Sequence, residues 1–226
     1  MNRKLKPELI NQALENLQAL YEDTHRGGIH ATDLIYCLTR SWYQKVKPLP
    51  STKDEVLFFS TGWGLQMVLF PKDQQAEPIE VDGIICSPDY KSREGYAELK
   101  TTRMSTHQKN KVGEKEYKDF PETWVEQIMA YCYATKQTKY DLLVLHLRGN
   151  YADVLIDLIG WELTFTQEEL DEHWQYILAR RDILVASLFS QPPTPYSYCK
   201  QWECSGCRYS LRCEANVLIT EEFVED

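Results

Sequence analysis

The chain has 226 residues, 34 of them acidic and 25 basic, and a formal net charge of -9. This length fits one domain with a sizeable core, and the acidic balance excludes a general polyanion-binding protein while leaving room for a local nucleic-acid surface. No apolar run is long enough to cross a bilayer and residues 1–12 lack a signal-peptide pattern, so we expect a cytoplasmic protein.

The N-terminal quarter of the sequence predicts helices. Residues 7–22 carry one apolar stripe, and residues 30–45 predict a second helix that Thr32 or Asp33 would cap and that contains Cys37. A loop is expected at 47–53, followed by a helix over 58–70 that includes Gln66. We expect a single domain over 1–226, with an N-terminal helical segment at 1–57, a core at 58–165 and a tail at 166–226.

Residues 79–101 predict a β-hairpin with charged side chains on both strands. Its two apolar runs flank turn-forming residues at 87–89 and 94–95. Because side chains alternate along a strand, Glu98 and Lys100 should share one face, and Asp82 on the neighbouring strand could lie opposite them. Charges within an apolar sheet are costly, and a hard cation would offset that cost.

Residues 102–120 predict a long polar connection with a local positive charge. Six basic and three acidic side chains lie between residues 100 and 119, and two interpretations stay open, a solvated loop or a loop that guides DNA. The DNA-guiding interpretation assigns contacts to Arg103, Lys109, Lys111 and Lys115. A helix should begin at Pro121, and it would place Gln127 and Tyr131 on the same side.

The second half of the chain predicts two more strands, at 140–147 and 151–163, and a long helix that Thr166 and Glu169 would cap. Strands on both sides of a helix, after a hairpin, imply a mixed sheet with helices packed on it. The sequence therefore predicts an α/β protein.

The C-terminal tail contains a group of closely spaced cysteines. Cys204, Cys207 and Cys213 supply three thiolates at short spacings, and four cysteines are the usual complement of an iron–sulfur cluster. The candidates for the fourth ligand are Cys37, Cys86, Cys132 and Cys199. Cys86 and Cys132 lie in apolar surroundings typical of buried cysteines, and Cys37 would join the two ends of the chain.

Several of these segments together resemble one family of nucleases. The resemblance rests on TDLIYCLTRSWYQ, GWGLQ, VDGII, AELKTT, QIMAY and CSGCRYSLRC. They are similar to segments of the RecB-type PD-(D/E)XK nucleases, and within them to the iron–sulfur exonucleases of CRISPR adaptation, the Cas-four family. The resemblance implies a restriction-endonuclease-like core and an iron–sulfur lobe that joins the N- and C-terminal segments.

The resemblance also implies roles for individual residues. Asp82, Glu98 and Lys100 would be catalytic, with Gln127 and Tyr131 supporting Lys100 and DNA. The carboxylates of Asp82 and Glu98, with the Leu99 carbonyl, would hold Mg²⁺ or Mn²⁺. The implied [4Fe–4S] ligands are Cys37, Cys204, Cys207 and Cys213.

The implied activity is metal-dependent cleavage of single-stranded DNA, mainly from the 5′ end, for the trimming of CRISPR spacer precursors alongside integrase proteins. One departure affects the metal site, because the family's usual Gly-x-x-x-His histidine corresponds here to Gln66, which could ligate through its amide oxygen. Two alternatives stay open. One is a viral or repair nuclease of the same fold, and the other is a non-catalytic DNA-binding adaptor with a four-cysteine zinc site.

Overall fold

The computed structural model describes residues 7–23, 27–91, 93–109, 114–147, 157–194 and 199–213. Its centre is a mixed four-stranded sheet with the order β3-β4-β7-β8. The strands are β3 (Tyr90–Lys91), β4 (Tyr96–Thr102), β7 (Lys139–His146) and β8 (Asp157–Thr164). β4 and β7 run parallel, and the two outer pairs are antiparallel. The predicted α/β class with a mixed sheet is confirmed.

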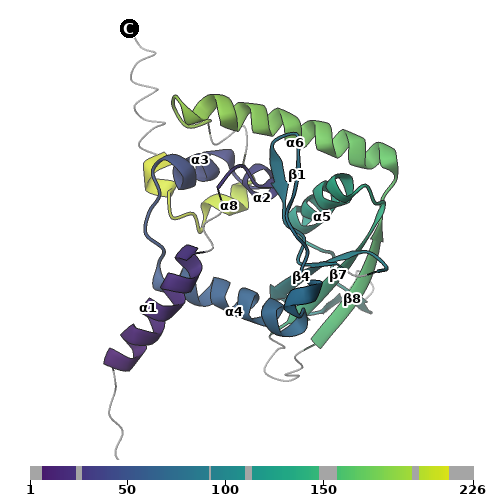
Figure 1. Cartoon of the computed structure of the whole chain (residues 1–226), viewed down its shortest axis with the longest axis horizontal. Coiled ribbons are helices and arrows are strands. Elements are labelled where there is room, and N and C mark those ends of the chain that lie inside the picture. Colours follow the sequence, from purple (N-terminus) through teal and green to yellow (C-terminus); the bar gives the residue numbers. More distant parts are fainter. Residues whose placement is uncertain are drawn as a thin grey trace, which may run out of the picture.

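Helices cover this sheet. The connection from β4 to the parallel strand β7 contains the β5–β6 hairpin and then α5 (Glu122–Thr135). α5 lies between the sheet and the long helix α6 (Gln167–Leu188) (Figure 1). The predicted capping box is present at the start of α6, where the Thr166 hydroxyl accepts from the Glu169 backbone N–H. The buried core extends from α5 and α6 to the apolar face of β7, where Leu142 and Val144 are almost fully buried.

The N-terminal helices differ in part from the sequence prediction. α1 (Pro7–Asp23) agrees with it, whereas the helix expected over 30–45 is two helices, α2 (Ala31–Ile35) and α3 (Leu38–Val46). The break falls at Tyr36, whose backbone is extended, and at Cys37, the N-cap of α3. The cap of α2 is His30, and Asp33 completes its capping box from within the helix.

α4 (Lys53–Leu69) begins five residues earlier than expected. Thr52 and Glu55 form a reciprocal capping box there, a signal that the sequence prediction passed over. A short 3-10 turn, η1 (Lys72–Gln74), follows. α1 packs on α4, and α4 in turn contacts β4.

The predicted pairing of the strands around Asp82 and Glu98 is wrong. β1 (Ile79–Val81) pairs with β2 (Ile84–Cys86), and the two residues between them, Asp82 and Gly83, have φ of 51° and 73°. Two residues with positive φ are what a tight type I′ hairpin turn requires, and Asp-Gly is a preferred pair for it. β4 therefore pairs with β3 and β7, not with the Asp82 strand.

The connection before α5 also contains regular structure that the sequence prediction missed. β5 (His107–Lys109) and β6 (Lys115–Tyr117) form a small antiparallel hairpin. At the C-terminal side, α8 (Gln201–Cys204) lies beside α3 (Figure 1). No helix among the described residues is long and apolar enough to cross a membrane.

Candidate active site

The core of the candidate site is a hydrogen-bonded group on β4 and α5. Lys100 Nζ donates to Glu98 Oε1 at 2.7 Å and to Gln127 Oε1 at 2.6 Å. Gln127 Nε2 donates to the same Glu98 oxygen at 2.8 Å and to the Tyr131 hydroxyl at 2.9 Å. The structure therefore brings together four of the five predicted catalytic residues.

The local geometry explains this arrangement. Glu98 and Lys100 are two residues apart on one strand and so share the face that α5 covers, while Gln127 and Tyr131 are four apart on one side of the helix. Gln127 is 5% exposed and Glu98 4% exposed, so both polar groups are held away from water. Such groups are costly without partners, and each here has at least one.

Glu98 has one carboxylate oxygen that these contacts do not use. Oε1 accepts from both Lys100 and Gln127, whereas Oε2 is buried and has no hydrogen-bond partner within the described part of the chain. An unsatisfied buried acceptor costs about 1–3 kcal/mol, and more when it is charged. A bound cation would remove that cost.

The electrostatics keep Lys100 positively charged. Burial lowers the pKa of Lys100, but the charge and hydrogen bond of Glu98, with a further contribution from the Asp89 charge, raise it above its usual value overall. Burial raises the pKa of the Tyr131 hydroxyl well above its usual value, and the charge of Glu98 adds to the effect. Tyr131 is therefore a neutral hydrogen-bonding group beside a fixed ammonium.

Asp82 does not join this group. It is exposed in the turn of the β1–β2 hairpin, where its Oδ2 accepts from Trp174 Nε1 at 2.9 Å and its carbonyl accepts from Arg181 at 2.6 Å. Both partners are on α6, and this hairpin reaches α6 away from β4 (Figure 1). The contacts of Asp82 dock the hairpin onto α6.

The structure places a different carboxylate beside β4. Asp89 Oδ2 accepts from the backbone N–H of Leu99 at 2.8 Å, in the middle of the Glu98-Leu99-Lys100 segment. Asp89 directly precedes β3, whose first residue pairs with Ala97. The signal in the sequence was the dipeptide Pro88-Asp89 ahead of Glu98-x-Lys100, which the sequence analysis treated only as a turn.

The remaining predicted metal and DNA contacts have varied positions. Gln66 is half-buried on α4, one turn after Gly62. Gly62 lies close to β4, because a Cβ added to it would be 3.6 Å from Thr101 Oγ1. Arg103 is exposed just beyond β4. Lys109 and Lys115 belong to β5 and β6, and Lys111 lies outside the described residues. Their assignment to DNA stays a prediction.

The predicted iron–sulfur lobe is not shown. Cys37 is buried, Cys204 is exposed, and Cys207 and Cys213 are intermediate. Across the described ranges, no group of three or more His, Cys, Asp or Glu residues is arranged to hold a metal ion. Cys199 Sγ lies 3.8 Å from Cys204 Sγ, and the Cys199 thiol also hydrogen-bonds to Cys37, so these three thiols are neighbours.

The two ends of the chain nevertheless meet in this region. The Cys37 backbone N–H donates to Glu203 Oε2 at 2.8 Å, and the rings of Tyr43 and Tyr209 stack with centroids 5.3 Å apart. The Tyr209 hydroxyl accepts from the Leu49 backbone N–H at 3.2 Å. The C-terminal segment is thus held against the N-terminal helices by contacts that need no metal.

Comparison with known proteins gives a fold. No protein-family model and no curated protein matches the sequence. The structure is similar to the crystal structure of SSO0001, with a TM-score of 0.54 and 16% identity, over 93% of this chain and 96% of that one. This likeness shows a shared fold along nearly the whole chain.

Two exonucleases are more distant in structure. The alkaline exonuclease LHK-Exo from Laribacter hongkongensis has a TM-score of 0.45 and 10% identity, over 77% of this chain and 94% of its own. A phage-related exonuclease from Haemophilus somnus 129PT has a TM-score of 0.43 and 11% identity, over 74% of this chain and 99% of its own.

Proposed function

We propose that this protein is a metal-dependent DNA exonuclease that degrades single strands, mainly from the 5′ end. The observation that carries the proposal is the Glu98 carboxylate, with one oxygen fixed by Lys100 and Gln127 and the other buried without a partner among the described residues. A buried acidic oxygen beside a fixed ammonium is suited to a cation and a phosphodiester.

The donor set fits Mg²⁺ or Mn²⁺. Oxygen ligands are what these hard cations prefer, and Glu98 Oε2, an Asp89 carboxylate oxygen and the Leu99 carbonyl are the donors that we assign. Gln66 remains our candidate for a further amide-oxygen ligand. A bound ion would polarise a phosphoryl oxygen and lower the pKa of a water molecule.

We assign Asp89 to the position that the sequence analysis gave to Asp82. The support for this change is the contact of Asp89 with the Leu99 N–H and the order Pro88-Asp89 followed by Glu98-Leu99-Lys100, which has the form of the PD-(D/E)XK motif. The role assigned to Asp82 is structural, since its side chain and carbonyl are both used by α6.

The protein groups have distinct tasks in this reaction. Lys100, kept positive by Glu98 and Asp89, would stabilise the negative charge that develops on the scissile phosphate. Gln127 holds Glu98 and Lys100 in a fixed relation, because its amide donates to one and accepts from the other. Tyr131 accepts from Gln127 and so orients the amide.

A [4Fe–4S] cluster on Cys37, Cys204, Cys207 and Cys213 is part of the proposal. Its support is the number and type of the thiols and their placement where the two chain ends meet. The described geometry does not assemble them into a metal group, so no step of the reaction is assigned to the cluster. A role in trimming CRISPR spacer precursors with integrase partners is supported by the sequence resemblance alone.

An end-label assay tests the function. A single strand labelled at the 5′ or the 3′ end is incubated with Mn²⁺, and a 5′ exonuclease releases the 5′ label as a short product first. Lys100→Ala and Glu98→Ala should abolish degradation, while Leu158→Ala, on the exposed side of β8, should not. Degradation that survives both active-site substitutions would contradict the proposed site, and an inactive wild-type protein would favour the adaptor alternative.

A further inference from the structure

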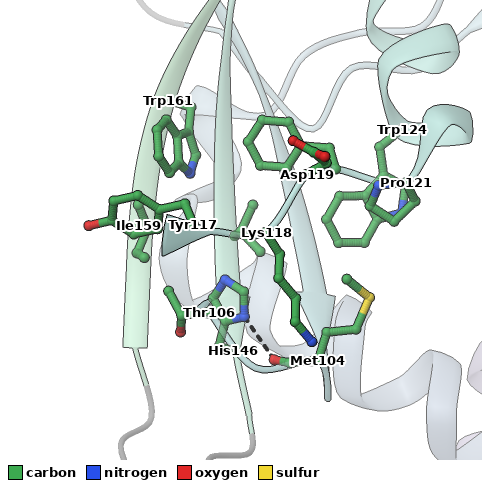
Figure 2. Close-up of a pocket in the computed structure, with 12 residues that line it drawn as sticks. Met104, Thr106, Tyr117, Lys118, Asp119, Pro121, Trp124, His146, Ile159 and Trp161 are labelled. Carbon is green, nitrogen blue, oxygen red and sulfur yellow. Dashed lines mark hydrogen bonds between the residues drawn. The ribbon is translucent and has the colours of Figure 1, made fainter. Parts of the chain in front are cut away.

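A pocket with aromatic walls lies next to the candidate active site. It is bounded by the β5–β6 hairpin, the segment that leads into α5, and strands β7 and β8. Its enclosed volume is about 20 Å³, and the wider empty space, which opens to solvent, is about 320 Å³. Figure 2 shows Trp161 and Ile159 on one side, Tyr117 near Trp161, and Pro121 and Trp124 on the other. The pocket is thus formed mainly by rings and apolar side chains.

The register of the sheet places this pocket on the same face as Lys100. Lys100 pairs with Val144, which pairs with Ile159, so the three side chains form one row. Val144 and Ile159 both line the pocket. Neighbouring strands are about 4.8 Å apart, so Ile159 lies about 10 Å from Lys100 across the sheet.

α5 connects the same two places from above the sheet. Trp124 lines the pocket and Gln127 holds the Glu98–Lys100 pair, and the two residues are three apart on one helix. Residues three apart lie on neighbouring positions of one helix face. The pocket and the candidate active site are therefore consecutive parts of one surface between α5 and the sheet.

The rings of the pocket pack edge to face around Trp161. Trp161 meets Tyr117 edge to face, with centroids 4.9 Å apart and an interplanar angle of 88°, and meets Phe120 at 5.6 Å and 77°. Tyr117 is 51% exposed, so part of this aromatic group is open to solvent. Aromatic side chains on a path for single strands act as stacking platforms for bases.

Charge is distributed unevenly around these rings. Lys118 lines the pocket, and its amine contacts Ser105 Oγ at 3.5 Å. The Lys118 amine and the Asp119 carboxylate lie at opposite ends of the pocket (Figure 2). His146, at the Lys118 end, has Nδ1 2.9 Å from the Met104 carbonyl oxygen. A DNA phosphate is therefore expected on the Lys118 side, away from Asp119.

We propose that the exposed Tyr117 side of this pocket takes the base of the nucleotide next to the scissile phosphate of a single DNA strand. The inference rests on the proposed nuclease function and adds a site for the base, which the carboxylates and Lys100 do not supply. The base stacks on the Tyr117 ring, with the nearly perpendicular Trp161 ring beside it, so recognition is tolerant of sequence.

Binding to strands that lack one base tests this proposal. A fluorescein-labelled single strand is titrated with protein in Ca²⁺ instead of Mn²⁺, and fluorescence anisotropy gives its Kd. One abasic residue is moved stepwise from the end of the strand. At one position it should weaken binding by the wild-type protein about fivefold or more, the effect of losing one stacked base.

Variants then locate the stacked base. Tyr117→Ala should bind the intact strand more weakly and lose most of the abasic effect at that position, and Tyr117→Phe should restore both, because the ring is what stacks. Leu158→Ala, a 47% exposed residue on the opposite face of β8, should behave as the wild type. An abasic effect that is absent, or equally large in Tyr117→Ala, would overturn the proposal.

The two proposals fail in different ways. A protein that degrades strands in Mn²⁺ but shows no abasic effect retains the nuclease function and loses the base pocket. A protein that shows the abasic effect but never degrades DNA loses the nuclease function and retains a single-strand binding site. A protein that neither binds nor degrades strands loses both.

Discussion

Gln127 contacts Lys100 with its amide oxygen at 2.6 Å, and the same amide donates its N–H to the carboxylate that Lys100 neutralises. One side chain from α5 thus bridges both charges of a pair on β4. A glutamine can do this because its amide carries an acceptor and a donor on adjacent atoms.

Gln127→Ala should lower the rate of Mn²⁺-dependent DNA degradation about 10- to 100-fold, the usual cost of losing a group that orients a metal ligand. The Glu98–Lys100 contact would remain, but it would lose its two hydrogen bonds to the Gln127 amide on α5. We also expect the Mn²⁺ concentration for half-maximal rate to rise, which loss of folded protein alone would not produce. Gln167→Ala, at an exposed position of α6, is the matched control, and equal activity of both variants would contradict the role of Gln127.

Asp89→Asn and Asp82→Asn separate the two candidate carboxylates. Asp89→Asn removes a charge beside β4 and should reduce degradation at least 100-fold, about 2.7 kcal/mol of transition-state stabilisation. Asp82→Asn should keep near wild-type activity, because asparagine tolerates positive φ and can still accept from Trp174. The reverse order of activities would restore Asp82 to the site.

Gly83→Ala tests the turn of the β1–β2 hairpin. Gly83 has φ of 73° and no other heavy atom within 4 Å of an added Cβ, so the cost is one of backbone conformation alone. We expect the free energy of unfolding, from urea titration, to fall by about 1–2 kcal/mol. A Cβ added at Gly64 also meets open space, but Gly64 lies within α4, where alanine is favoured over glycine. Gly64→Ala should therefore raise the free energy of unfolding by up to about 1 kcal/mol.

Colour and metal content test the proposed metal centre of the cysteines. We expect the purified protein to be brown with visible absorbance, and Cys207→Ala to lose both colour and solubility, since metal binding is coupled to folding. Cys86→Ala, on β2, should stay brown. A colourless protein with stoichiometric zinc, or a well-folded colourless Cys207→Ala, would contradict the cluster or its stabilising role.

Two buried thiols make stability depend on pH. Burial raises the pKa of Cys86 and that of Cys132 from 9.0 to about 12. The thiol form is favoured in the folded state, so this contribution to stability is complete below pH 9 and is lost as the pH rises toward 12. A Cys86→Ala/Cys132→Ala double variant should show a shallower decline in urea midpoint over this range, and an unchanged slope would contradict the assignment.

The sequence was sufficient where a residue's role depends on local spacing. The capping box of Thr166 and Glu169 and the shared side of Gln127 and Tyr131 follow from helical periodicity. Strand partners depend on turn geometry instead. Asp82-Gly83 is a two-residue turn in its own right, which joins β1 to β2. The prediction placed Asp82 within a strand and therefore paired it with the wrong strand, the one that carries Glu98.

The pocket could not be predicted from spacing. Its walls come from four separate segments, and Trp161 and Tyr117 are brought together only by the antiparallel pairing of β8 with β7 and the fold of the β5–β6 hairpin. The role of Asp89 could have been predicted from the sequence, because Pro88-Asp89 and Glu98-x-Lys100 lie within one short stretch. It was missed because Pro88-Asp89 is also a typical turn sequence.

Helix α5 fixes the distance between the proposed base site and the proposed catalytic group. Trp124 and Gln127 are separated by three residues of α5, or about 4.5 Å along the helix axis. An alanine inserted between them would rotate one relative to the other by about 100°. Such a protein should still fold its sheet but lose the alignment of the proposed base site with the proposed catalytic group, so the spacing along α5 would set how far a bound base lies from the scissile phosphate.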